Sequence, residues 1–179
     1  MRKISLGKTQ DLDRLVKLEI DCMSRFFLEE DLPKPYPIAD ALEDKKIRLI
    51  EERGNLLAFL SLGHDLRKTL FPEAKTSRPF YDFLEVLGNP STPASVIECF
   101  AYDLDYGPGG LSELFKDEER NRKGDDFFLL LSKEMKSLLP IWAELGFQNL
   151  GREWKEGGDN PYLLYKPFIP SGLCRNIGW

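Results

Sequence analysis

Apolar and polar positions along the chain follow two different periods, and the changes of period mark strands and helices. Residues 2–6 (RKISL) are interpreted as a short first strand. Between Leu12 and Phe27, apolar residues recur at steps of three and four, as on one face of a helix. That stripe comprises Leu12, Val16, Ile20, Met23 and Phe27. We expect it to be the buried side of a helix whose N-cap lies within residues 9–11.

Three closely spaced prolines end this helix. Pro33, Pro35 and Pro37 cannot continue a helical hydrogen-bond ladder, so they predict an extended connection. A second, shorter helix is expected over residues 38–44.

The clearest hairpin in the sequence lies between residues 46 and 62. Apolar runs at 46–51 and 56–62 flank Arg53-Gly54-Asn55, where Gly and Asn accept turn dihedrals. Residues 65–93 then follow without a clear period and are rich in proline and aromatic residues. Long loops of this kind often line a binding site, so residues 71–83 are a candidate wall of a substrate pocket.

The second half of the chain again alternates strands and helices. Its expected elements are a strand at 95–102, a helix at 111–122, a strand at 126–132, a helix at 137–145, and strands at 148–156 and 162–166. Ser137 is the expected N-cap of the helix at 137–145, which would put Pro140 in its first turn. The order β-α-α-β-β-β-α-β-α-β-β shows no repeat, and it predicts a single domain over residues 1–168 with a tail at 169–179.

Charge and composition exclude several classes of function. The 179 residues include 25 basic and 30 acidic ones, a net charge of −5, which disfavours nucleic acid as a ligand and suits a cationic amine substrate. Three scattered cysteines and one histidine have no metal-type spacing, so no metal site is expected. No apolar run is long enough for a membrane span, and the N-terminus lacks the pattern of a signal peptide, so we expect a cytoplasmic protein that does not bind membranes.

Two stretches carry the most specific pattern. The apolar strand at 97–106 (IECFAYDLDY) contains an internal glutamate and runs into a glycine-rich loop at 107–112 (GPGGLS), directly before a helix. Residues 127–131, 141–147 (IWAELGF) and 150–153 (LGRE) then follow in strand, helix, strand order. In order and spacing, these segments resemble the fourth strand, phosphate loop, fifth strand, fourth helix and sixth strand of the GNAT acyltransferase superfamily. The agreement in element order extends from residue 2 to residue 168.

The resemblance implies a fold and an activity. The fold is an α/β (α+β) one, with a mixed, mostly antiparallel central sheet of about six to seven strands flanked by helices. The activity is N-acyl transfer, in which a small-molecule or peptide amine attacks the thioester of acetyl-CoA directly. The resemblance implies no metal, and we expect a monomer or homodimer.

The glycine-rich loop is the expected site of the donor. Successive backbone N–H groups at the start of a helix, together with the positive end of the helix dipole, suit an anion such as a pyrophosphate. By resemblance, the acetyl-CoA contacts are Phe100, Ala101 and Tyr102 on the strand and Gly107, Gly109, Gly110, Leu111 and Ser112 on the loop. Read without the resemblance, residues 107–110 are a tight turn.

The catalytic candidates lie on the same strand. Glu98 is the candidate general base, because burial in an apolar strand would raise its pKa; the alternative is a carboxylate that faces solvent or forms a salt bridge. Tyr102 or Tyr106 is the candidate acid. Strand alternation places Cys99 on the opposite face from Glu98, which argues against a paired nucleophile. His64 is interpreted as a surface or hydrogen-bonding residue.

The sequence also departs from the family pattern. Gly107 replaces an Arg or Gln, Pro108 removes an amide donor, and Ser112 replaces a Gly or Ala. Trp142 stands where many members have an acidic Tyr, and its indole cannot supply a proton near neutral pH, so we interpret it as a core aromatic. These departures leave a second hypothesis open: a GNAT-fold module that binds CoA or another protein without catalysis.

Overall fold

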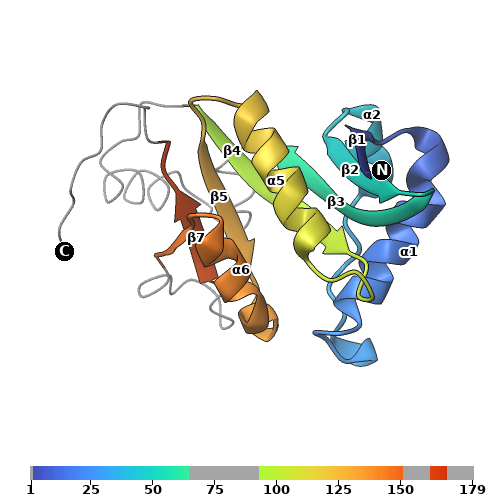
Figure 1. Ribbon diagram of the computed structural model, residues 1–179. Coiled ribbons are helices and arrows are strands. Elements are labelled where there is room, and N and C mark those ends of the chain that lie inside the picture. The colour runs from blue at the N-terminus through green and yellow to red at the C-terminus, as the bar shows by residue number, and fades with distance from the viewer. Residues whose placement is uncertain (1, 65–92, 151–161, 169–179) are drawn as a thin grey trace.

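A seven-stranded sheet runs through the protein in the order β1-β2-β3-β4-β5-β7-β6 (Figure 1). The computed structural model describes residues 2–64, 93–150 and 162–168. Only β4 and β5 run parallel, and the other neighbouring strands pair antiparallel. This confirms the predicted mixed, mostly antiparallel sheet flanked by helices.

The elements follow the predicted order. The strands are β1 (Arg2–Leu6), β2 (Ile47–Glu52), β3 (Asn55–Gly63), β4 (Ala94–Tyr102), β5 (Asp126–Leu131), β6 (Gln148–Asn149) and β7 (Tyr162–Lys166). The helices are α1 (Leu12–Met23), α2 (Ile38–Glu43), α5 (Gly109–Asn121) and α6 (Leu139–Glu144), with 3-10 turns η1 (Thr9–Asp11), η2 (Glu29–Asp31) and η3 (Lys133–Leu138). The predicted loop at 65–93 (apart from Pro93), most of the strand predicted at 148–156, and the tail lie outside the described residues.

The hairpin between β2 and β3 closes as the turn residues predict, with a shift of one position. Arg53 and Gly54 occupy the turn at φ 54° and 84°, and Asn55 begins β3. Two successive positive φ angles match the right-handed twist of the two strands.

The predicted buried stripe of α1 is confirmed in part: Leu12, Val16, Met23 and Phe27 are partly buried and pack against the core, but the most buried face of the helix is a neighbouring one. The buried residues are Leu15, Leu18, Glu19 and Cys22, whereas Ile20 is 48% exposed. The helix packs on β4 and β3 through this second face. Glu19 enters the buried face because its carboxylate accepts a hydrogen bond from the backbone N–H of Tyr36, at 2.9 Å.

The helix predicted at 137–145 begins differently from the expectation. Residues 133–138 form the 3-10 turn η3, and the N-cap of α6 is Leu138 rather than Ser137. Pro140 still falls in the first turn, where its missing N–H removes no helical bond. Gly146 follows the helix with φ 90°, a conformation that favours glycine.

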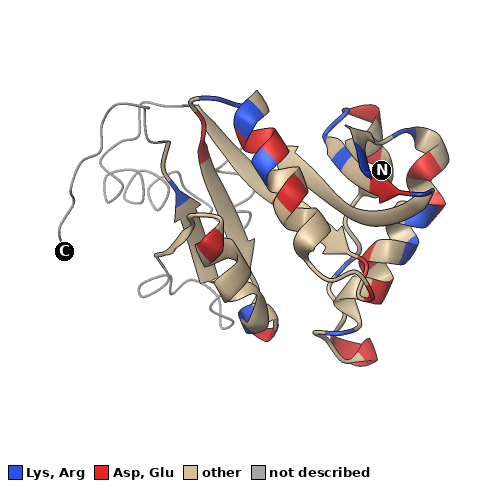
Figure 2. Ribbon diagram, in the orientation of Figure 1, with Lys and Arg blue, Asp and Glu red and all other residues tan. Residues whose placement is uncertain are grey.

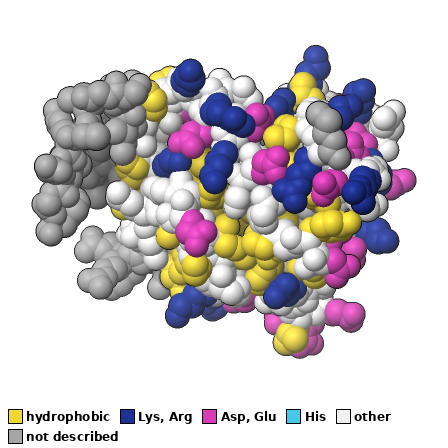
Figure 3. Space-filling model, in the orientation of Figure 1, with side chains coloured by type: hydrophobic (Ala, Val, Ile, Leu, Met, Phe, Trp, Pro, Cys, Tyr) yellow, Lys and Arg dark blue, Asp and Glu magenta, His cyan; other side chains and the backbone are white. Residues whose placement is uncertain are grey.

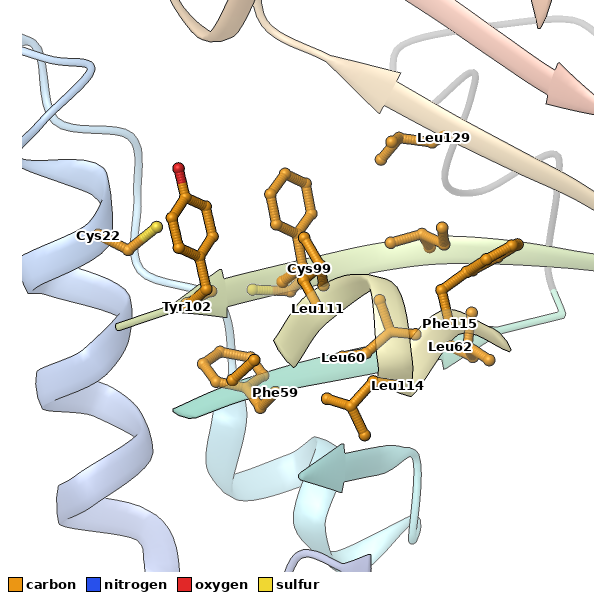
Figure 4. Close-up of a cluster of buried hydrophobic side chains, with 14 of the residues drawn as sticks. Cys22, Phe59, Leu60, Leu62, Cys99, Tyr102, Leu111, Leu114, Phe115 and Leu129 are labelled. Atoms are coloured by element: carbon orange, nitrogen blue, oxygen red, sulfur yellow. The ribbon is translucent and has the colours of Figure 1, made fainter. Parts of the chain in front are cut away.

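The core lies on both faces of β3 and β4. Leu111, Leu114 and Phe115 project from α5 over Leu60 and Leu62 of β3 (Figure 4). Gly110 is buried because its Cα lies directly over β2 and β3; an added Cβ would be 3.3 Å from the Leu57 Cβ. The first turn of α5 is therefore fixed against the sheet by packing.

Lys, Arg, Asp and Glu are frequent along α1 and α5, whereas β3 carries none (Figure 2). Arg48 of β2 binds Asp117 and Glu118 of α5, each at 2.8 Å, which ties this helix to the sheet. In the space-filling view, hydrophobic side chains gather in the middle of the face and charged ones surround them (Figure 3). Among the described residues, no helix has the length and apolar character of a membrane span.

Candidate functional site

Strands β4 and β5 share a ladder at one end and diverge at the other (Figure 1). Their pairing runs from Ala94 with Asp126 to Ile97 with Leu129 and stops there. Residues 99–102 continue as β4 and remain paired with β3 on their other side. One edge of β4 therefore faces an opening rather than a neighbouring strand.

Glu98 is the first residue of β4 beyond the parallel ladder, and it sits at an irregularity in the pairing. Ser61 of β3 pairs with Cys99 and Leu62 pairs with Ile97, so Glu98 has no partner across the ladder. An extra residue of this kind bends a strand and redirects its side chains, and such irregularities are common beside active sites.

The divergence opens into a cleft of about 340 Å³. Its charged lining residues are Glu19, Lys34 and Glu98. The apolar walls include Met23, Phe27, Phe100, Leu129, Met135 and three prolines, Pro33, Pro35 and Pro37. The proline-rich connection predicted as extended is thus one wall of the cleft. A neighbouring hollow of about 660 Å³ shares Phe27, Pro33 and Ser132 with it.

Tyr36 joins Glu98 to the floor of the cleft. Its phenolic oxygen donates to Glu98 Oε2 at 2.7 Å and lies 2.9 Å from Ser61 Oγ. Because a phenol has one proton, Ser61 is left to donate to Tyr36, which gives a chain from Ser61 through Tyr36 to Glu98. Burial, followed by the nearby Glu98 carboxylate, raises the pKa of Tyr36, so it remains a neutral donor.

The half-buried Glu98 carboxylate also depends on the absence of a side chain opposite it. A Cβ at Gly63 would overlap the Glu98 carboxylate. The sequence prediction that Glu98 lies in an apolar strand holds, but its burial is partial. What fixes the side chain is the hydrogen bond from Tyr36.

Glu19 is a second carboxyl group in the same cleft, and the sequence prediction missed it. It is 6% exposed, and its Oε1 accepts from Tyr36 N at 2.9 Å and from Cys99 Sγ at 3.8 Å. Its Oε2 has no hydrogen-bond partner among the described residues. Burial raises its pKa. The sequence did contain an indication of Glu19: Leu15, Leu18 and Cys22 form a second apolar face of the helix, and Glu19 lies on that face.

The prediction that Cys99 faces away from Glu98 is wrong in its geometry. Both residues line the same cleft, because the irregularity at Glu98 interrupts the alternation of β4. Burial, with Glu19 nearby, raises the pKa of the Cys99 thiol well above its ordinary value. Cys99 is therefore a buried thiol that donates to Glu19 rather than a nucleophile.

The glycine-rich loop forms a tight turn into α5. Gly107 has φ 70°, and its N–H is bonded to the Asp103 carbonyl at 2.9 Å. Pro108 is the N-cap, so Gly109, Gly110 and Leu111 are the first three helical residues, whose N–H groups have no helical partner. The Ser112 N–H bonds the Pro108 carbonyl at 3.1 Å. Five backbone amides of this loop were predicted to contact the donor. Those of Gly109, Gly110 and Leu111 are free at the start of α5, whereas those of Gly107 and Ser112 are hydrogen-bonded within the loop.

The three amides face different amounts of space. A Cβ added at Gly109 would meet nothing within 4 Å, so the backbone there is open to an anion. The loop carries acidic rather than basic neighbours: Asp105 N donates to Asp103 Oδ1 at 2.9 Å just before the turn. The backbone therefore fits a pyrophosphate, while the side-chain charges nearby weaken its attraction.

The three strand residues predicted to contact the donor are all buried. Phe100 lies at the divergence, with its ring centroid 5.4 Å from that of Trp142, and Ala101 is fully buried. Tyr102 is 3% exposed; it lines a separate hollow with Asp103 and Asp105, not the cleft of Glu98. Burial raises the pKa of the Tyr102 phenol.

Trp142 is a core residue, as interpreted from the sequence. It is fully buried and packs edge-on against Phe100, Phe115 and Phe147. Its Nε1 has no hydrogen-bond partner among the described residues. Tyr106, the alternative acid, is 51% exposed, and its hydroxyl accepts from the Asn55 amide at 3.3 Å.

The single histidine lies away from the cleft lining. His64 Nε2 is 2.8 Å from Arg122 Nη1 on the protein surface, which fits its interpretation as a hydrogen-bonding residue. In the described part of the chain, no group of three or more His, Cys, Asp and Glu side chains is arranged to hold a metal ion.

Comparison with solved structures places this architecture. No protein-family model matches the sequence, and no curated protein matches it significantly. A GNAT-family acetyltransferase from Streptococcus agalactiae is similar with a TM-score of 0.68 and 17% identity, over 94% of this chain and 95% of that one. The ribosomal-protein-S18-alanine N-acetyltransferase from Escherichia coli is similar with a TM-score of 0.60 and 17% identity, over 100% of both chains.

A third similar structure was solved with coenzyme A. N-acetylglutamate synthase from Neisseria gonorrhoeae, complexed with coenzyme A and L-arginine, gives a TM-score of 0.57 and 15% identity, over 93% of this chain and 33% of that one. At these identities the likeness shows the fold alone. The chain has the GNAT fold, as its sequence motifs indicated.

Proposed function

We propose that the protein is an N-acyltransferase in which an amine acceptor attacks acetyl-CoA directly, with Glu98 as general base. The observation that carries the proposal is the position of Glu98. It stands at the point where β4 and β5 diverge, lines the cleft, and is held by Tyr36 at 2.7 Å. A half-buried carboxylate at the mouth of a mainly apolar cleft suits proton removal from an ammonium group.

The similar structures support the donor and the class of reaction. Two of them bear the names of enzymes that acetylate an amine, one of these solved with coenzyme A. In this chain the amides of Gly109, Gly110 and Leu111 would hold the pyrophosphate, and the unpaired edge of β4 at residues 100–102 would hold the pantetheine arm. Acetyl-CoA supplies the acetyl group as an activated thioester.

The side chains of the cleft then move one proton. Glu98 accepts a proton from the bound ammonium, so that the free amine forms the new N–C bond as the C–S bond breaks. Ser61 orients Tyr36, and Tyr36 orients the Glu98 carboxylate. Tyr102, which lies outside the cleft lining, is our candidate for the acid that protonates the departing thiolate, although burial raises its pKa and makes it a weaker proton donor.

A transfer assay tests this proposal. The full chain is incubated with acetyl-CoA and a panel of primary amines, and both released thiol and acetylated product are measured. We expect Glu98→Gln to lower kcat on the order of 10²- to 10⁴-fold, with acetyl-CoA affinity unchanged. Glu43→Gln, on the exposed side of α2, is the matched control. Undiminished turnover in Glu98→Gln would overturn the role of Glu98.

A further inference from the structure

The buried carboxyl of Glu19 has no part in the reaction described above. It lines the cleft, is 6% exposed, and leaves Oε2 without a partner in the described part of the chain. Burying a carboxyl group with an unsatisfied oxygen is costly. Its structural contacts, the hydrogen bonds from Tyr36 N and Cys99 Sγ to Oε1, require only an acceptor oxygen, which an uncharged amide would also provide. The fold therefore does not require the acidic group of Glu19, and we interpret it as a group that binds a ligand.

Glu19 and Glu98 are held at opposite ends of one residue. The backbone N–H of Tyr36 binds Glu19, and the phenolic hydroxyl of the same residue binds Glu98. The two carboxyl groups are thus separated by roughly the length of a tyrosine, and both line one cleft. A linear chain of four or five carbons between two nitrogen atoms has a comparable span.

The rest of the cleft favours a ligand with an apolar middle and positive ends. Its remaining charged lining residue is Lys34, whose side chain is exposed. The remaining walls of the cleft are mostly apolar, with Met23, Phe27 and Phe100 among them. Such a surface accommodates methylene groups, while each carboxylate pairs with an ammonium.

We propose that the acceptor is a linear aliphatic diamine, bound with its reacting nitrogen at Glu98 and its distal ammonium at Glu19. This inference rests on the proposed function and narrows its acceptor. The reacting ammonium first gives one proton to Glu98. The free amine then forms the N–C bond to the acetyl group, and as the C–S bond breaks the second proton of the nitrogen passes to the departing thiolate. The distal ammonium is unchanged, and the product is a monoacetylated diamine with one positive charge.

The same arrangement discriminates against other amines. An amino acid would bring its carboxylate toward Glu19, where like charges repel. A simple monoamine of equal length would leave Glu19 without a partner. A dication is the ligand that satisfies both carboxyl groups at once.

Binding without any donor tests the inference separately from catalysis. The full chain is titrated calorimetrically with 1,4-diaminobutane, 1,5-diaminopentane, 1-aminobutane and 5-aminopentanoate. We expect the diamines to bind at least about tenfold more tightly than the monoamine, as expected for one added partly buried ion pair, and the amino acid to bind most weakly. 1,2-Diaminoethane and 1,8-diaminooctane should both bind more weakly than the diamines of intermediate length.

Substitution of Glu19 identifies the residue responsible. In the calorimetric titration, Glu19→Gln should abolish the preference for diamines, whereas Glu43→Gln should retain that preference. In the transfer assay, Glu19→Gln should raise the KM for diamines at unchanged kcat. Equal binding of diamine and monoamine by the wild type, no optimum of chain length, or a preference that survives Glu19→Gln would overturn the inference. Should Glu19→Gln fold poorly, the chain-length series on the wild type decides. A separate titration with acetyl-CoA shows whether the donor site itself has failed.

Discussion

The loop at 107–112, which we propose binds the donor, and the cleft around Glu98, which we propose binds the acceptor, both adjoin β4 but are built from different parts of the protein. The loop at 107–112 offers backbone: three glycines, a proline and the free amides of a helix start. The cleft offers side chains from several elements: Glu19 of α1, Tyr36 of the connection before α2, Ser61 of β3 and Glu98 of β4.

This difference determines how each region responds to change. A backbone site tolerates the loss of side chains but not the addition of atoms above its amides. A side-chain site depends on each hydroxyl and carboxyl group, because the buried partners that remain are left unsatisfied. The predictions below test this contrast.

Among the variants that compare the two regions, the largest effect is expected in the cleft, at Tyr36. Tyr36→Phe removes one oxygen and leaves the fully buried Ser61 hydroxyl and the Glu98 carboxylate without that partner. We expect the free energy of unfolding to fall by about 1–3 kcal/mol and kcat to fall about tenfold. Denaturant unfolding and steady-state kinetics measure the two effects. Tyr162→Phe, on β7 and outside the cleft lining, is the control and should change neither.

The second-largest effect is expected in the loop, where a single added methyl group separates an effect on acetyl-CoA binding from an effect on stability. Gly109→Ala places a Cβ in open space, so stability should be unchanged or slightly higher, while acetyl-CoA should bind about tenfold more weakly because the methyl group obstructs the amides. Gly110→Ala instead brings a Cβ within 3.3 Å of the Leu57 Cβ and should mainly reduce stability. If Gly109→Ala left acetyl-CoA affinity unchanged, the backbone-built donor site would be contradicted.

These two regions also differ in how far the sequence could predict them. The loop is encoded locally: a strand, a glycine-rich turn and a helix follow each other, so its position and the start of α5 were foreseeable. The cleft depends on long-range contacts, with Tyr36 reaching across 62 positions to Glu98. Tyr36 was visible only as part of a proline-rich helix break, and nothing local indicated its partners.

The errors in the α1 stripe and at Cys99 share that cause. Two apolar faces compete on α1, and packing against β4 and β3, which the periodicity does not contain, decides between them. An irregular pairing between β3 and β4 turns Cys99 into the cleft, against simple alternation. The element order, by contrast, follows from local signals and was predicted throughout.

The smallest effect is expected from the charge on Glu19, as a change in pH dependence. Burial raises the pKa of Glu19 above 4.5 in the folded protein. The folded state therefore holds its proton longer than the unfolded state, and stability declines as pH rises from about 4.5 through the raised pKa. Glu19→Gln should remove this component, so that its stability relative to the wild type improves as pH rises across that window.

Thermal unfolding of the two proteins between pH 4 and pH 8 measures this difference. The charged and titratable groups around Glu19 are Cys99, Tyr36, Lys34 and Glu98, and all of them remain in the variant. Parallel stability curves for wild type and Glu19→Gln would show that the buried carboxyl does not titrate in this window.

We propose above all that the loop at 107–112 binds the donor. Calorimetric titration of the full chain with acetyl-CoA, and separately with CoA, tests this proposal. We expect binding in the micromolar range, a free energy of roughly −8 kcal/mol. Three free amides at the start of α5 and an open backbone at Gly109 remain, although the loop has no basic side chain. No heat of binding at millimolar ligand would contradict it and leave the GNAT fold without its donor.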